Sequence, residues 1–140
     1  MGAGVALALE AASPIMSGIA GYQEAQGQKQ QAEINAYIGR TRAIQTDTSS
    51  REGLNSQLAN MRATFAANGQ KPGVGAMEML KEARRVSGRD RRIQYGNRMQ
   101  EAADWKMAAK NAGNSGKNAL LGGFIKAGPS LFDLYDYYKK

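Results

Sequence analysis

Apolar residues recur at helical spacings along most of the chain, and polar residues fill the positions between them. A seven-residue repeat, or a 4-3-4 step, places such residues on one narrow face of a helix. The pattern predicts a long helix over 22–68 with its seam at Tyr37, Ile44, Leu54, Leu58, Met61 and Phe65. A helix of that length would extend about 70 Å, which a small globule cannot surround, so it needs another long helix or a partner subunit.

A second helical pattern covers 76–112. Its face is predicted from Met79, Val86 and Ile93, which lie seven apart, with Leu80 and Ala83 beside them and Met99, Ala102, Ala103 and Met107 continuing it. The segment Asn111–Asn118, NAGNSGKN, is rich in turn residues and predicts the end of this helix.

One sharp break separates the two patterns. The stretch NGQKPGVG, residues 68–75, holds three glycines and Pro72. Asn68-Gly69 is a typical helix stop, and proline disfavours helix at its own position and at the residue before it. The fold predicted from the residues is therefore all-α: an elongated antiparallel helical hairpin with apolar terminal segments, assembling into a larger oligomer.

Three segments follow from this pattern: an apolar N-terminal segment 1–21, the long hairpin 22–112 with its reversal at 68–75, and a C-terminal segment 113–140 that is first glycine-rich and then aromatic. Glu10 and Pro14 make the first segment a poor membrane span. It fits either a loosely packed amphipathic helix or a segment that inserts into a membrane conditionally.

The C-terminal segment holds the densest apolar cluster. Its candidate contact residues, for a membrane or a protein collar, are Leu120, Leu121, Phe124, Ile125, Leu131 and Phe132. Aromatic residues and lysines beside short apolar runs are typical of membrane interfaces. A tail that docks on the protein's own helices or on a neighbouring subunit explains the same residues equally well.

Composition excludes several chemistries. The chain has no cysteine and no histidine, so disulfides, common zinc sites and the usual catalytic triads are ruled out. Glu78 and Glu82 lie four apart, but exposed glutamates at this spacing are commonplace. We expect no enzyme activity, no catalytic residue, no cofactor and no metal.

The net charge of +7 favours polyanionic partners. The charge is concentrated in ARRVSGRDRR, residues 83–92, whose basic residues are Arg84, Arg85, Arg89, Arg91 and Arg92. Arginine pairs well with phosphate, so these residues are candidates for contact with nucleic acid or an acidic partner. A solvated helix face is the alternative.

Four stretches in this order carry a resemblance: GIAGYQEAQGQKQQAE, then RATFAANGQKPGVGAMEMLKEA, then RRIQYGNRMQEAADWKMAAKNA, and last GNSGKNALLGGFIKAG. The chain resembles the small internal virion proteins, or ejection proteins, of short-tailed phages, of the type called internal virion protein B. The aromatic tail SLFDLYDYYKK departs from that pattern.

The resemblance implies a non-enzymatic protein in the virion interior near the portal or tail, which reaches the host cell envelope after ejection. It would help form a conduit for genome delivery. The partners implied are copies of the chain itself, the portal and other internal virion or tail proteins, double-stranded DNA and the host membrane. The alternatives are a permanent structural connector or tail-associated virion protein, and a small basic nucleic-acid-binding protein.

Overall fold

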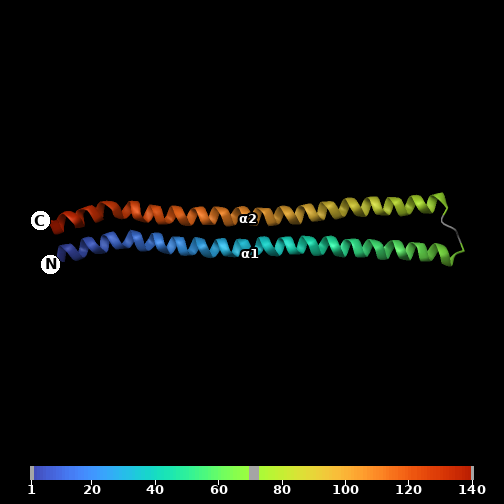
Figure 1. The fold of residues 1–140 in the computed structure, drawn as a ribbon, viewed down its shortest axis with the longest axis horizontal. Helices are drawn as coiled ribbons and strands as arrows, with labels where there is room; N and C mark the ends of the chain where they lie inside the picture. Colours follow the sequence, from blue (N-terminus) through green and yellow to red (C-terminus); the bar gives the residue numbers. More distant parts are fainter. Residues whose placement is uncertain (1, 70–72, 140) are drawn as a thin grey trace. The chain divides into compact units, whose positions relative to one another are not determined.

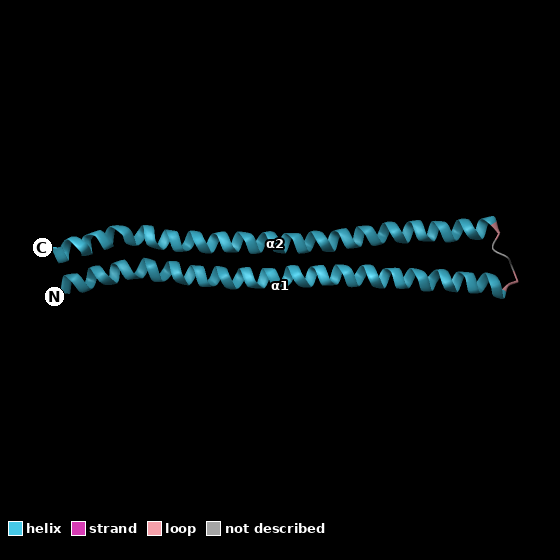
Figure 2. Cartoon of the chain, viewed as in Figure 1, coloured by secondary structure: helices cyan, strands magenta, loops and turns pink. Residues whose placement is uncertain are grey.

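The computed structural model of the protein is all-α, as the sequence predicts. Helix α1 spans Gly2–Ala67 and helix α2 spans Val74–Lys139. The two helices pack against each other as an antiparallel hairpin (Figures 1 and 2). The structure describes residues 2–69 and 73–139, with side chains described from Ala6 onward and Leu7 excepted.

The chain reverses between Ala67 and Val74, where the sequence predicts a break. The Gly69 N–H donates a hydrogen bond to the Ala66 carbonyl oxygen at 3.0 Å, which closes the last turn of α1. Gly69 has a φ of 64°, in the left-handed region that glycine enters without steric cost because it lacks Cβ. Residues 70–72, which include the predicted helix breaker Pro72, lie outside the described residues.

The helix end predicted at 111–118 is wrong, because α2 continues to Lys139. Gly116 lies inside the helix and faces α1: a Cβ added to it would sit 2.9 Å from the Cβ of Ala25. This glycine therefore permits close approach of two helices and does not form a turn. Pro14 and Pro129 likewise lie inside α1 and α2.

The hairpin divides into two compact units. Unit 1 consists of Met1–Ile34 with Trp105–Lys140, and unit 2 consists of Asn35–Asp104. Each unit therefore contains one stretch of α1 packed against one stretch of α2. The three-segment organisation predicted from the sequence stays a prediction.

In unit 1 the helices meet along a row of alanines and glycines that recur every seven residues. This small-residue seam comprises Ala11, Gly18, Ala25 and Ala32 of α1 and Ala109, Gly116 and Gly123 of α2, all of them buried. A seven-residue repeat keeps one side of each helix against its neighbour. Because these residues have little or no side chain, the two backbones come into direct van der Waals contact.

The close approach is visible at the glycines of α1. A Cβ added to Gly18 would lie 2.9 Å from the carbonyl oxygen of Ala119, and one added to Gly21 would lie 3.2 Å from the Cβ of Ala119. Contacts of this kind stabilise through dispersion between many atom pairs and through weak Cα–H···O interactions, not through burial of large apolar area.

Around Leu58, unit 2 is held by larger side chains. Leu58 is buried, and the half-buried residues beside it include Leu54, Met61 and Phe65 of α1 and Leu80 of α2. The 4-3-4 seam predicted over 54–65 is therefore confirmed. Ala83 of α2 is half-buried as well, as predicted.

Other positions of the predicted seam are wrong. Tyr37 and Ile44 of α1 are exposed, and the buried residues nearby are Gly39 and Ala43. On α2 the predicted row of Met79, Val86 and Ile93 is exposed, as are Ala103 and Met107, whereas Ala102 is buried and Met99 is half-buried. Around Gly39, Ala43 and Ala102 the contact face uses small residues, and Tyr37 and Ile44 lie on the solvent side.

Candidate functional site

The arginine cluster lies on α2 in unit 2. Arg84, Arg85, Arg89 and Arg92 are exposed, whereas Arg91 is half-buried. The Nε atom of Arg91 lies 3.4 Å from a carboxylate oxygen of Asp47 on α1. Arg91 thus contributes to packing between the helices, and the other four arginines are directed to solvent.

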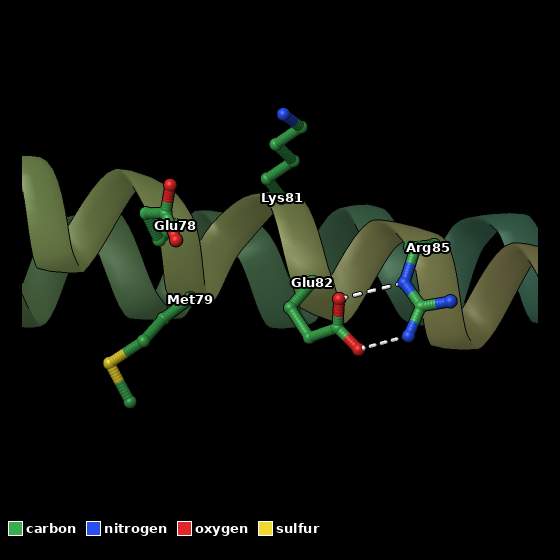
Figure 3. Close-up of a pocket in the computed structure, with 5 residues that line it drawn as sticks. All are labelled: Glu78, Met79, Lys81, Glu82 and Arg85. Carbon is green, nitrogen blue, oxygen red and sulfur yellow. Dashed lines mark hydrogen bonds and ion pairs between the residues drawn. The ribbon is translucent and has the colours of Figure 1, made fainter.

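Arg85 is held by Glu82, one turn earlier on the same helix. Its Nε and Nη2 atoms donate to the two carboxylate oxygens of Glu82 at 2.8 and 2.6 Å (Figure 3). This bidentate pairing lowers the pKa of Glu82, mainly through the hydrogen bond from Arg85, and raises the pKa of Arg85. Arg85 is therefore oriented, and its charge is offset locally by the carboxylate of Glu82.

The exposed arginines surround a shallow depression. It is lined by Arg84, Arg85, Gly88, Arg89, Arg92 and Ile93. A Cβ added to Gly88 would meet no atom within 4 Å, so the missing side chain leaves open space between the guanidinium groups. We define Arg84, Arg85, Arg89 and Arg92 as the arginine rim. Three of them, Arg85, Arg89 and Arg92, are those that the sequence places on one side of the helix. Such a site can accept phosphate or carboxylate oxygens.

A second depression lies next to it on α2. It is lined by Glu78, Met79, Lys81, Glu82 and Arg85. Figure 3 shows Met79 and Lys81 extending in different directions, and Glu82 is already paired with Arg85. Within residues 2–69 and 73–139, no group of three acidic residues could hold a metal ion.

The predicted apolar contact residues lie on α2 in unit 1. Leu120 is half-buried, whereas Leu121, Phe124, Ile125, Leu131 and Phe132 are exposed, with Ile125 and Phe132 about three-quarters accessible. They belong to a regular helix rather than to a separate tail.

Three apolar residues of α1 in the same unit belong to the N-terminal segment that the sequence gives as apolar, but the sequence does not show which side of the helix they occupy. Leu9, Met16 and Ile19 are also exposed, at 66%, 69% and 43%. The signal that could have found them is the spacing of Ala11, Gly18 and Ala25, which identifies the contact side of α1 and so leaves these three residues on the outside.

No helix in the described part of the chain is long and apolar enough to cross a membrane. Comparison of the chain with protein-family models, with curated protein sequences and with solved structures found no match.

Proposed function

We propose that the protein is a structural component of a phage particle, carried in the virion interior and released to help deliver the genome across the host envelope. In this role it acts through two surfaces, the arginine rim of unit 2 and the exposed apolar residues of unit 1, and it catalyses no reaction. It works as an oligomer with the portal or with other internal virion or tail proteins.

The observation that carries this proposal is the large amount of apolar surface in unit 1. A monomeric soluble protein rarely exposes contiguous apolar patches of more than a few hundred Å². Residues such as Phe124 and Phe132 therefore favour a partner, which in a particle would be a protein collar and after release a membrane. The ordered resemblance to small ejection proteins connects this surface to genome delivery.

The arginine rim supports a second contact, with DNA phosphates or with an acidic protein surface. Binding to DNA through phosphate contacts would depend on salt, because each neutralised phosphate releases counterions, and such contacts carry no information on base sequence. The variant R85Q/R89Q/R92Q removes three of these charges. Its charge-matched control is K106Q/K110Q/K117Q, which removes three exposed bases of α2 in unit 1.

If the rim binds DNA, the arginine variant will weaken binding in a salt titration and flatten its salt dependence by about three counterions, whereas the lysine variant will retain both. Equal loss in the two variants would show that only net charge matters. That result would remove the specific role of the rim.

The proposed release from the particle is tested by quantitative mass spectrometry of purified virions before and after receptor-triggered DNA release. Presence in full particles and loss from emptied ones is the expected result. Presence in both at a fixed copy number would contradict ejection and favour a permanent connector. Absence from both would contradict the virion role altogether.

A further inference from the structure

The two helices of unit 1 present their outward residues on two distinct sides. In an antiparallel pair, residues at the same place in the seven-residue repeat lie on the same side of both helices. The contacts agree: Gly21 meets Ala119 on one side of the seam, and Gly113 meets the side chain of Lys29 on the other. Residues can therefore be assigned to a side by their distance in sequence from the small-residue seam.

The side that carries Gly113 and Lys29 is apolar toward the ends of the helices. Its large exposed residues are Leu9, Met16 and Ile19 of α1 and Leu121, Phe124 and Leu131 of α2. We define these six residues as the apolar face. Each helix contributes to it, so the face is broader than the stripe of a single amphipathic helix.

The opposite side is mainly polar, and two large exposed residues of α2, Ile125 and Phe132, lie between the two sides, on the edge of the helix farthest from the small-residue seam. The polar side carries Glu10, Ser17 and Glu24 of α1 and Lys126, Asp133 and Asp136 of α2. Most of the acids of unit 1 thus lie away from the apolar face. The pair of helices is amphipathic as a whole.

The apolar face is flanked by lysines. Lys106, Lys110 and Lys117 of α2 continue its side along the helix and are exposed. Beyond its other end, Lys139 lies 5.6 Å from the centre of the Tyr135 ring. An acid, Glu33, also lies among the described residues of this side. Its carboxylate oxygen is 3.7 Å from the Nζ atom of Lys29, so the lysine offsets its charge.

We propose that the apolar face lies flat on the surface of an anionic lipid bilayer, with both helices in the plane of the interface and neither crossing it. Apolar residues would enter the boundary between headgroups and acyl chains, and the flanking lysines would contact anionic headgroups. Tyrosines such as Tyr135, near the end of α2, suit that boundary because their rings are amphipathic.

The charges around the apolar face favour an anionic bilayer over a second copy of the chain as its partner. Lysines flank the apolar face at both ends, so two copies placed face to face would bring lysines near lysines in either relative direction. An anionic lipid surface complements both ends at once. The proposal deepens the proposed function by naming the surface met at the envelope, but it is tested on the purified chain and so can fail separately from residence in the particle.

The test is co-flotation of the full chain with vesicles of phosphatidylcholine containing one quarter phosphatidylglycerol, compared with phosphatidylcholine alone. Two variants probe the face: L121Q/F124Q/L131Q removes apolar groups, and K106Q/K110Q/K117Q removes flanking charge. The matched controls are M79Q/V86Q/I93Q, three exposed apolar residues of α2 in unit 2, and R40Q/R42Q/R62Q, three exposed arginines of α1 in unit 2. Circular dichroism verifies that each variant remains helical.

We expect binding to anionic vesicles that falls at least about tenfold in the apolar variant and about fivefold per lysine removed at low salt, with little change in either control. Equal losses in variants and controls would overturn the proposal, because binding would then be non-specific. Face-dependent dimerisation in sedimentation velocity without vesicle binding would also overturn it and assign the face to a second copy. Absence of both would overturn it as well.

Discussion

Gly123 and Gly18 face each other across unit 1 so closely that a Cβ added to Gly123 would lie 3.0 Å from the Cα of Gly18. The same Cβ would lie 2.7 Å from the carbonyl oxygen of Pro14. Both neighbouring atoms belong to the backbone of α1, so they cannot rotate away as a side chain would. The helices must separate locally to admit even one methyl group.

Gly123→Ala is therefore expected to destabilise the protein by about 1–3 kcal/mol, despite the better helix propensity of alanine. Gly122 is the matched control, because a Cβ added there meets nothing within 4 Å. Gly122→Ala is expected to stabilise by about 0.5–1 kcal/mol. Urea unfolding followed by circular dichroism measures both. Equal stability of the two variants would contradict the close approach at Gly123.

The hairpin itself could be predicted from the sequence because its reversal depends on strong local signals. Glycine at position 69 and proline at 72 act within a few residues, and long breaker-poor stretches flank them. The seam of unit 1 could not be predicted by the same reasoning. Alanine and glycine carry little hydrophobic signal, so a search for large apolar residues selected Tyr37 and Ile44, which the structure exposes.

The candidate sites were also hard to predict, because the sequence does not show which side of a helix each residue occupies. The arginines of 84–92 could be named from composition, but only the structure separates Arg91, which pairs with Asp47, from its exposed neighbours. On α1, the sequence gives Leu9 and Met16 only as part of an apolar segment, and the structure shows that both are exposed. To say which side of a helix a residue occupies, one must know which residues contact the other helix. In unit 1 those contact residues are small, so the sequence does not mark them clearly.

A pair of substitutions tests which residues form the contact face of α1 in unit 2. Leu58 is buried at 4% exposure, so Leu58→Ala should cost about 2–4 kcal/mol through lost contacts and a cavity. Ile44 belongs to the seam predicted from sequence but is exposed, and Ile44→Ala should change stability by no more than about 0.5 kcal/mol. Thermal and urea unfolding report both values. A large loss of unfolding free energy in Ile44→Ala would contradict this contact face and would favour the one predicted from the large apolar residues.

Asp47 links two arginines in unit 2. Its carboxylate oxygens lie 2.9 Å from the Nε of Arg51 on the same helix and 3.4 Å from the Nε of Arg91 on α2. Because Asp47 and Arg91 are only 21% and 27% exposed, their pairing is screened less than that of a surface pair.

A double-mutant cycle with Asp47→Asn and Arg91→Gln should give a coupling free energy of about 0.5–1 kcal/mol. The cycle of Asp47→Asn with Arg51→Gln is the control for the pair within one helix, where about 0.3–0.5 kcal/mol is expected. Unfolding in urea at low and high salt measures both couplings. A coupling of zero between positions 47 and 91 would show that the contact between helices adds no stability.

Glu82 should titrate below the ordinary range of a glutamate, because its carboxylate accepts two hydrogen bonds from Arg85. Since the pKa is lowered on folding, the pairing stabilises the folded state above the unfolded pKa of glutamate. This contribution is lost as the pH falls through the lower, folded pKa. The effect on stability is small because both groups are exposed to solvent.

Carboxyl-detected NMR titration of the full chain can follow Glu82 directly. Arg85→Gln should raise its pKa toward the ordinary value, whereas Lys81→Gln, which removes a neighbouring charge without breaking a hydrogen bond to Glu82, should leave most of the lowering in place. Equal effects of the two variants would mean that general positive charge, not the bidentate pairing, sets the pKa. Protonation of Glu82 also releases Arg85, so binding of DNA, whose phosphodiesters stay ionised, should strengthen at the arginine rim over the same fall in pH, and Glu82→Gln should strengthen it without a pH change.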